Sequence, residues 1–592
     1  MQELMFPFNG SFLLKKRRKI KRELLASENQ LIEKRIAILG GSTTHDIRDM
    51  LELFLLNEGI CPVFYESEYA QYWQDAMFDN ETLRSFSPDI IYIHTTFRNL
   101  AILPTVRDTK ETVEQKLKDQ YAHFYEMWER LMTVYHCPII QNNIERPIHR
   151  LLGNKDISDW HGYSNFVARL NQNFYEYAQA HDGFYINDID YLSSVYGLEK
   201  WSDPIYWHMY KYALSLQAIP ELAFSVSNII KAIYGKNKKA LVLDLDNTLW
   251  GGVVGDDGVD GLVIGQETPM GQIYTEFQKY IKKQKDIGVL LNVCSKNDEM
   301  NAIAGLSHPD GVLKPEDFIC IKANWNNKDQ NILEIASELN IGADSLVFID
   351  DNPAEREIVK AQIQGIAVPN IGCVEDYLTR IDRNGFFEVV NLSEDDLKRN
   401  DMYKANTERT KLKNTFQDYE EYLKSLDMVG TIRDFEPVYI ARIAQLTNKS
   451  NQFNLTTKRY TENEIQNVFD STDHIRLYGK LKDRFGDNGI VSVVIGRIEN
   501  EALHIDLWLM SCRVLKRNME YAMLDRLVEE VSSRNLKKLI GYYFPTAKNN
   551  MVKQFYETMG FEKLSEDVNG NTVWQLSVDA YKNKNFVIKV VK

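Results

Sequence analysis

The sequence predicts an α/β protein of three domains, over residues 1–235, 236–390 and 391–592. Its length of 592 residues suggests three or four domains. Apolar runs of strand length alternate with helical stretches through the first two parts, which is typical of parallel sheets. A polar, charged stretch that begins at Ser393 then separates these parts from a third one, for which a mixed α+β fold is predicted.

The first domain opens with an apolar strand at 35–39 that runs into the small residues Gly40-Gly41-Ser42-Thr43-Thr44. A second strand is predicted at 89–94, and helical stretches are predicted at 111–134 and 163–181. This alternation of strands and helices predicts a parallel sheet joined by helical crossovers.

The small residues after the first strand resemble the first block of SGNH-type hydrolases, in which a serine follows the first strand. That resemblance fits a triad of Ser42, Asp203 and His208, although the family's Asp-x-x-His is replaced here by a longer spacing. Two alternatives stay open. The domain is either degenerate and binds a partner or supports the enzyme, or its turn binds an anion through backbone N–H groups at a helix start.

Three apolar strands of the second domain end in polar residues. They are 241–243 before Asp244-Leu-Asp246-Asn-Thr248, 289–294 before Ser295, and 346–349 before Asp350 and Asp351. Because ligands of parallel sheets bind beyond the carboxyl ends of the strands, we expect Asp244 and Asp246 to lie where a phosphate and a divalent cation meet.

These strands, the helical stretches at 270–287 and 329–339, and Lys328 resemble in their order the motifs of the haloacid-dehalogenase (HAD) phosphatase superfamily. The spacing from Asp244 to Ser295 and on to Lys328 leaves no room for a large cap domain, so we expect an open site. For the Asp244 motif alone, a strand followed by an Asx-type turn is the structural alternative.

The resemblance implies a chemical role for each of four residues. Ionised Asp244 attacks phosphorus and forms an aspartyl-phosphate. Asp246 is the general acid for the leaving oxygen and then the base for water. Ser295 and Lys328 hold the transferring oxygens, and Lys328 supplies a fixed positive charge to the transition state.

The same resemblance implies a bound Mg²⁺, an ion that prefers octahedral oxygen ligands. Its expected ligands are the carboxylates of Asp244 and Asp350 and the backbone carbonyl of Asp246. Asp351 either assists the metal ligands or caps the turn at Asn352.

The third domain is predicted to hold strands at 490–498, 502–510 and 537–544 and a helix at 518–534. Its segment 549–561 resembles the closing motif of the GNAT acyltransferase fold. In that fold a Gly-rich turn and a helix N-terminus receive the pyrophosphate of coenzyme A.

Here the corresponding turn reads Arg513-Val-Leu-Lys516-Arg517-Asn518, with Lys516 and Asn518 at glycine positions. We therefore expect a pantetheine arm on a carrier protein rather than free acetyl-CoA, with docking near Lys516 and Arg517. The candidate contacts to that arm are Arg513, Lys516, Arg517, Asn550 and Tyr556.

Five segments, 244–258, 294–298, 448–457, 483–489 and 510–515, resemble the signatures of FkbH-type proteins, a branch of HAD subfamily IIIC. The resemblance implies a bifunctional glyceryl transferase/phosphatase. Such an enzyme takes a phosphoglyceryl unit from 1,3-bisphosphoglycerate, removes the phosphate, and leaves a glyceryl thioester on an acyl carrier protein.

Cys512 is the candidate for an enzyme-bound thioester, because a neighbouring cation such as Arg513 favours the nucleophilic thiolate. The alternative is a small buried hydrophobe at a strand end. We expect the domain that carries Cys512 to cover the phosphatase site. Asn451, Gln452 and Asn454 either hydrogen-bond a glyceryl hydroxyl or pantetheine amide, or cap a turn.

A second class of function remains, a phosphatase and acyltransferase of surface-polysaccharide or secondary-metabolite assembly that acts on a sugar or small phosphorylated intermediate. A scaffold with decayed sites is a third, which the intact carboxylates disfavour. The net charge of −14 argues against a general nucleic-acid binder. No membrane span or signal peptide is found, so a cytoplasmic protein is expected.

Six scattered cysteines lack the spacing of a metal site, which favours reduced thiols over a disulfide framework. One basic run, 15–22, either contacts an acidic partner or membrane surface or is a solvated helix face.

Overall fold

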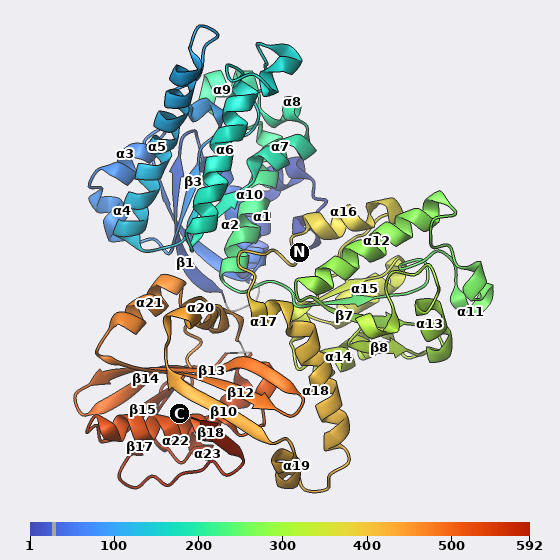
Figure 1. Ribbon diagram of the computed structural model, residues 1–592, viewed down its shortest axis with the longest axis vertical. Coiled ribbons are helices and arrows are strands. Elements are labelled where there is room, and N and C mark those ends of the chain that lie inside the picture. The colour runs from blue at the N-terminus through green and yellow to red at the C-terminus, as the bar shows by residue number, and fades with distance from the viewer. Residues whose placement is uncertain (27–30, 451, 547, 592) are drawn as a thin grey trace. The chain divides into compact units, whose positions relative to one another are not determined.

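The computed structural model describes residues 1–26, 31–450, 452–546 and 548–591, and many of its elements are labelled in Figure 1. By its internal contacts the chain divides into two compact units, residues 1–233 and 234–592. The second unit contains two separate sheets, so that the molecule has three sheets in all among the described residues. Mixed α/β structure with parallel sheets, as predicted, is therefore confirmed.

The first unit is built on a parallel sheet in the order β2-β1-β3-β4-β5. Its strands are β1 (Ile32–Gly40), β2 (Ile60–Glu66), β3 (Ile90–His94), β4 (Ile139–Asn142) and β5 (Phe184–Asn187). Its helices are α1 (Gly10–Ala26), α2 (His45–Asn57), α3 (Tyr72–Met77), α4 (Glu81–Phe86), α5 (Lys110–Tyr135), α6 (Tyr163–Ala180), α7 (Ile189–Tyr196), α8 (Leu198–Trp201), α9 (Pro204–Tyr210) and α10 (Ile219–Ile233).

The predicted strands 35–39 and 89–94 and the helices at 111–134 and 163–181 are confirmed as β1, β3, α5 and α6. Three strands were not predicted. β4 and β5 have only four residues each, too few to show a period, and β2 contains Pro62, which argues against a strand in the sequence, and has half-buried residues.

The first sheet of the second unit is also parallel, in the order β8-β7-β6-β9. Its strands are β6 (Ala240–Leu243), β7 (Leu290–Ser295), β8 (Cys320–Ala323) and β9 (Leu346–Ile349). Its helices are α11 (Val254–Asp257), α12 (Pro269–Asp286), α13 (Glu299–Leu306), α14 (Lys328–Glu338), α15 (Pro353–Gln362) and α16 (Val374–Arg383).

All four residues of β6 are buried, because helices cover both faces of a parallel sheet. Ala240 and Val242 contribute to one hydrophobic cluster with Ile332 and Ile335 of α14. This packing fixes α14 against the sheet and sets the position of its first residue, Lys328.

Three helices connect this sheet to the next one: α17 (Glu394–Leu397), α18 (Arg399–Lys413) and α19 (Tyr419–Ser425). On α18, Arg409 donates through Nε and Nη2 to both oxygens of Asp483, at 2.8 and 2.7 Å. The Asp483 side chain is fully buried, and a bidentate pair of this kind fixes orientation as well as distance. The pair therefore anchors the connecting helix to the last sheet.

The last sheet follows the order β16-β17-β15-β14-β13-β12-β10-β18, with β11 paired to β14. Its strands are β10 (Met428–Asp434), β11 (Phe453–Asn454), β12 (His474–Asp483), β13 (Gly486–Glu499), β14 (Ala502–Met510), β15 (Lys538–Tyr543), β16 (Glu562–Glu566), β17 (Thr572–Ser577) and β18 (Ile588–Val591). Its helices are α20 (Ile440–Lys449), α21 (Glu462–Asp470), α22 (Met519–Ser533) and α23 (Phe555–Thr558).

This sheet has a hydrophobic layer on each face, because successive side chains of a strand point to opposite sides. Val494 of β13 belongs to the cluster that includes Leu527 of α22, whereas its neighbours Val493 and Ile495 belong to the cluster that includes Ile443 of α20. The predicted strands at 490–498, 502–510 and 537–544 are confirmed as β13, β14 and β15, and the helix at 518–534 as α22.

Within the described residues, no helix combines the length and apolar character needed to cross a membrane. All six cysteines are free thiols, as the scattered spacing predicted.

Candidate active site

Asp244 continues the hydrogen-bond ladder of β6 by one residue beyond its last strand position. Its backbone N–H donates to the carbonyl of Ile349 at the end of β9, at 2.9 Å. This bond fixes the residue at the carboxyl edge of the sheet. Oδ2 of Asp244 lies 2.8 Å from Nζ of Lys328, while Oδ1 is buried and has no hydrogen-bond partner among the described residues.

Asp350 follows β9 and lies directly beside Asp244. Its Oδ2 accepts from Lys328 Nζ at 2.6 Å and its Oδ1 from the Asn352 N–H at 2.8 Å. The side chain is fully buried. Burial and the neighbouring Asp244 charge raise the pKa of Asp350 to about 6.

Lys328 is the first residue of α14, and its side chain is almost fully buried between these two carboxylates. Burial disfavours its charged form, but the attraction to Asp244 and Asp350 outweighs that effect, so the pKa of Lys328 lies above its usual value. Lys328 is therefore a fixed cation at the carboxyl edge.

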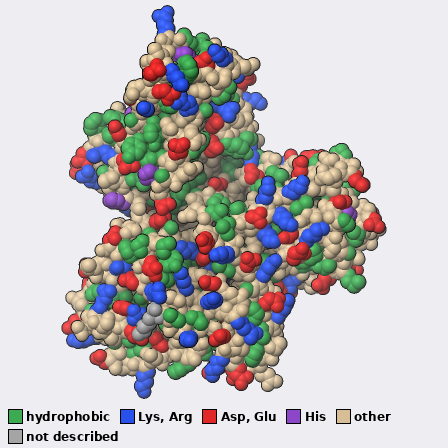
Figure 2. Space-filling model, in the orientation of Figure 1, with side chains coloured by type: hydrophobic (Ala, Val, Ile, Leu, Met, Phe, Trp, Pro, Cys, Tyr) green, Lys and Arg blue, Asp and Glu red, His purple; other side chains and the backbone are tan. Residues whose placement is uncertain are grey.

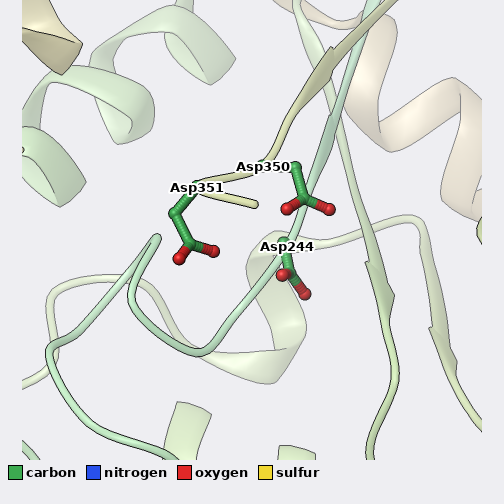
Figure 3. A group of neighbouring side chains, drawn as sticks. All are labelled: Asp244, Asp350 and Asp351. Atoms are coloured by element: carbon green, nitrogen blue, oxygen red, sulfur yellow. The ribbon is translucent and has the colours of Figure 1, made fainter. Parts of the chain in front are cut away.

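Asp244, Asp350 and Asp351 form a group of carboxylates whose nearest oxygens all lie within 4.8 Å of one another. Figure 3 shows the three side chains converging from the ends of β6 and β9. Asp351 does not cap the following turn, because Asn352 itself accepts from the Ala354 N–H there at 2.9 Å. Asp351 therefore lies beside the expected metal ligands Asp244 and Asp350, which is the first of the two alternatives given for it.

Asp246 is not part of this group. Its carboxylate instead accepts hydrogen bonds from three donors. Oδ1 accepts from Trp250 Nε1 and from the Val254 N–H, both at 3.0 Å, and Oδ2 accepts from Asn297 Nδ2 at 2.9 Å. Burial raises the pKa of Asp246, which favours the protonated form of the acid. The predicted metal contact of this residue was its backbone carbonyl, and that stays a prediction.

The chain between Asp244 and α12 contains only α11, a 3-10 turn at Val259–Gly261 and two isolated bridges, Asp246 with Trp250 and Gly251 with Val263. It has no room for a large cap, as the spacing predicted. Trp250 is almost fully buried, and its ring is so close to Gly305 of α13 that a Cβ there would come within 2.9 Å. This contact positions the donor that orients Asp246.

Ser295 is the last residue of β7 and is buried at the same edge of the sheet. Two residues later, buried Asn297 donates to Asp246. The sequence pattern alone assigns Asn297 no role, although it lies in the 294–298 signature. An amide two residues after a strand that ends at the site was the signal that could have identified it.

Cys512 lies at the opposite edge of this sheet. Its backbone carbonyl accepts from Asn340 Nδ2 at 2.7 Å, and Asn340 follows the C-terminus of α14. Lys328 is at the other end of α14, whose 11 residues span about 16 Å. The expectation that the domain carrying Cys512 covers the phosphatase site is therefore not met at Cys512, because β14 ends near the amino ends of the sheet strands.

The five candidate contacts to a pantetheine arm do not form one site. Lys516 and Asn550 are exposed, whereas Tyr556 is buried against Gly541, where a Cβ would clash with its ring. Arg517 is buried and forms an ion pair with Asp483 at 3.1 Å. Docking of a carrier on Arg517 is therefore excluded by its burial.

Arg513, the remaining candidate, has a buried side chain whose Nε donates to Ser511 Oγ at 3.1 Å. Asn454 caps a turn, since its Oδ1 accepts from the Thr457 N–H at 2.8 Å. Gln452 has a buried amide oxygen without a partner among the described residues, and Asn451 lies outside those residues.

In the first unit, Ser42, Asp203 and His208 form no hydrogen bond with one another in the described part of the chain. Asp203 caps α9 by accepting from the Ile205 N–H at 2.8 Å, while His208 is exposed on that helix. Ser42 Oγ is buried and has no hydrogen-bond partner among the described residues. A working triad is therefore not formed in this structure.

The basic run 15–22 lies within α1, whose Leu13, Ile20 and Leu24 are buried. Lys21 pairs with Glu52 of α2 at 2.7 Å. These contacts agree with the interpretation of the run as a helix face rather than as a surface for an acidic partner or membrane.

A parallel sheet that ends in clustered aspartates bridged by a buried lysine defines a phosphatase-like α/β protein. Residues 35–231 match the model of the FkbH N-terminal domain. A crystal structure of the N-terminal part of BF1531 from Bacteroides fragilis, which contains a phosphatase domain complexed with Mg, shares 30% identity and a TM-score of 0.59. The match covers 63% of this chain and 99% of that one. The chain belongs to the same family as that phosphatase-domain protein.

Two acetyltransferase structures match smaller parts of the chain. The ribosomal-protein-S18-alanine N-acetyltransferase from Escherichia coli shares 12% identity, with a TM-score of 0.21, over 27% of this chain and 99% of that one. The PaiA N-acetyltransferase from Thermoplasma acidophilum, in complex with coenzyme A, shares 13% identity, with a TM-score of 0.20, over 25% and 98%. These scores are too low to assign an activity. No curated protein matches the chain.

Proposed function

We propose that this protein is a Mg²⁺-dependent phosphatase that forms an aspartyl-phosphate on Asp244 and delivers a glyceryl unit to an acyl carrier protein. One observation carries the phosphatase part. Asp244, Asp350 and Asp351 converge at the carboxyl edge of a parallel sheet, with Lys328 bound to the first two. The family relation to a phosphatase-domain protein supports it.

The residues at this edge fit a magnesium ion. Carboxylate oxygens are the ligands that Mg²⁺ prefers, and three of them lie within 4.8 Å of one another. Asp244 Oδ1 is buried without a hydrogen-bond partner among the described residues, which is a costly arrangement unless a ligand satisfies it. The BF1531 phosphatase domain was crystallised with Mg. When bound, the ion neutralises phosphoryl charge and orients the attack.

Asp244 and Asp246 have different roles in the proposed reaction. A carboxylate oxygen of Asp244 attacks phosphorus, and the bond from phosphorus to the leaving oxygen breaks. Asp246 gives its proton to that oxygen; its Oδ2 accepts only one of the three hydrogen bonds, so this atom has room for the proton. Water next attacks the aspartyl-phosphate and returns a proton to Asp246, which releases phosphate and restores Asp244.

The substrate part of the proposal is a phosphoglyceryl unit taken from 1,3-bisphosphoglycerate, with the pantetheine arm of a carrier protein as acceptor. Its support is the resemblance to FkbH-type proteins together with the match to the FkbH N-terminal domain. Cys512 lies at the other edge of the sheet from Asp244, so the unit does not pass directly between them. In this proposal the long, flexible pantetheine arm of the carrier protein moves the unit between the two edges of the sheet.

Mass spectrometry of intact candidate carrier proteins tests this proposal, after incubation with enzyme, Mg²⁺ and 1,3-bisphosphoglycerate. The wild type should give a glyceryl adduct, and Asp244→Asn a heavier phosphoglyceryl adduct on enzyme or carrier. Glu357→Gln is a matched control, since Glu357 is exposed on α15 of the same domain. Carriers that stay unmodified with active phosphatase would overturn the transfer part and leave the phosphatase part intact.

A further inference from the structure

A cavity of about 380 Å³ lies at the amino edge of the sheet β8-β7-β6-β9, within the second unit. Lys239, Val289 and Ser345 line it, and each comes directly before one of the strands β6, β7 and β9. The opposite wall is the end of β14 and the turn after it, from Met510 to Arg513. We call this space the cation cavity.

The name follows from the charged side chains that line it. The cations are Lys238, Lys239, Arg399, Arg442, Lys449, Arg513 and Lys548, and the carboxylates are Asp344, Glu388, Asp395 and Asp396. Seven cations therefore meet four carboxylates in a chain whose net charge is −14. On the molecular face drawn in Figure 2 basic and acidic side chains are interspersed, so this surplus is a local feature.

Two carboxylates are shared among four of these cations. Asp395 lies 2.8 Å from Arg442 Nη2 and 3.8 Å from Arg513 Nη2. Asp396 pairs with Arg399 and lies 3.2 Å from Lys449 Nζ. Each carboxylate thus compensates two cations, which leaves positive charge uncompensated.

Lys239 has no carboxylate within ion-pair distance among the described residues, and its Nζ reaches only the Lys449 carbonyl, at 3.5 Å. Arg442 has a buried Nε without a partner in the same part of the chain. Donors of this kind are costly to leave unsatisfied, so they indicate an acceptor that binds in the cavity.

The pKa shifts of the basic side chains in the cation cavity also indicate that an anion binds there. Burial, followed by repulsion from neighbouring cations, lowers the pKa of Lys449, and burial lowers the pKa of Lys239 and that of Arg442, the latter to about 9. A bound anion would offset both effects, because an opposite charge stabilises the protonated forms.

We propose that the cation cavity binds a small organic phosphate that carries at least two negative charges. The planar guanidinium group of arginine can donate two parallel hydrogen bonds to a phosphate. The volume of the cation cavity lies near the lower end of the range of about 300–1,000 Å³ for small-molecule sites. The site lies at the edge of the sheet opposite Asp244, so it goes beyond the proposed phosphatase and stands even if that activity fails.

Cys512 provides a local reporter of occupancy. It lines the cavity, is partly exposed, and its Sγ lies 3.8 Å from the hydroxyl of buried Tyr403. A ligand held by Lys239 and Arg442 should shield this thiol from alkylation. Cys373 is exposed elsewhere and serves as an internal standard, because its alkylation should not change.

The experiment measures alkylation of Cys512 by iodoacetamide in the full-length protein, read by peptide mass spectrometry. EDTA is present so that the aspartate edge does not contribute a metal-dependent phosphate site. The probes are 2,3-bisphosphoglycerate, 3-phosphoglycerate, pyrophosphate and coenzyme A. We expect 2,3-bisphosphoglycerate to protect Cys512, and Lys239→Gln to raise its half-protecting concentration at least about tenfold, as expected for loss of one charged hydrogen bond.

Lys239→Gln breaks no ion pair, so it should fold; Arg442→Gln is a second variant with the same expected direction. Lys360→Gln is the matched control, since Lys360 is a half-exposed lysine of α15. Protection that is the same in Lys239→Gln and the wild type, or no protection by any probe, would overturn the site. Protection by coenzyme A alone would overturn the assignment to a small phosphate, because the source would then be a pantetheine-bearing molecule.

Discussion

At its carboxyl edge the sheet β8-β7-β6-β9 ends in three carboxylates beside one buried lysine, whereas at its amino edge it borders a cavity with seven cations and four carboxylates. Helix α14 spans the distance between them, with Lys328 at its start and Asn340 just past its end. In the two proposals the edges act on phosphate by different means, one through attack by a carboxylate and the other through cationic side chains.

The difference shows how strand direction organises this molecule. Residues that follow the strands meet at the edge where parallel sheets place their chemistry. Residues that precede the strands meet at the other edge, where the turn after β14 adds Arg513 and α20 adds Arg442 to the lining of the cavity. The comparison predicts that substitutions at one edge leave the chemistry of the other unchanged.

The largest effect is expected for Asp244→Asn, which keeps the shape of the side chain but removes the nucleophilic charge. Loss of a covalent nucleophile costs several powers of ten in turnover. Steady-state hydrolysis of acetyl phosphate with Mg²⁺ is the measurement. Near-native turnover would contradict the assignment of the carboxyl edge, and loss of Cys512 protection in this variant would contradict the independence of the two edges.

Replacement of Lys328 by Met should destabilise the fold, because Asp244 and Asp350 would then repel each other with no cation between them. Breaking a buried ion pair in this way costs about 3–5 kcal/mol. Chemical denaturation without Mg²⁺ measures the loss. Added Mg²⁺ should restore part of it, since the ion binds the folded state. An unchanged denaturation midpoint without metal would show that the lysine does not stabilise these carboxylates.

A smaller effect is expected for Asn297→Ala, which removes one of the three donors to Asp246. Hydrogen bonds to charged groups contribute about 1.5–3 kcal/mol, so turnover should fall by roughly tenfold or more. The measurement is kcat for acetyl phosphate, with Asn301→Ala on nearby α13 as the control. If kcat is the same in both variants, Asn297 does not orient the acid.

The smallest effect is expected at the rim of the amino edge, for Lys548→Ala. Lys548 pairs with Asp344, but both side chains are more than a third exposed. Surface ion pairs of this kind contribute about 0–1 kcal/mol. Chemical denaturation should therefore detect almost no change, and a loss of several kcal/mol would mean that the rim is part of the buried cluster.

Much of the carboxyl edge was predictable from the sequence, because Asp244 and Asp350 directly follow apolar strands and Ser295 ends one. The orientation of Asp246 was not, since it depends on Trp250 and Asn297, whose roles appear only when the loop is folded.

The cation cavity could not be predicted, because its residues come from segments more than 300 positions apart, such as Lys239 and Lys548. The predicted carrier contact at Arg517 failed for the same reason. Its charge suggested an exposed docking residue, but Asp483, distant in sequence, pairs with it in the core.

The central claim is that Asp244 is the phosphorylated residue, and trapping the phospho-enzyme tests it most directly. Asp246→Asn removes the base for water, so the adduct should accumulate when the leaving group is as good as an acyl phosphate. The variant is incubated with acetyl phosphate and Mg²⁺, quenched in acid, digested and mapped by mass spectrometry. The account predicts one added phosphate on the peptide that carries Asp244, removed by hydroxylamine. No adduct, or an adduct on another residue such as Cys512, would contradict it.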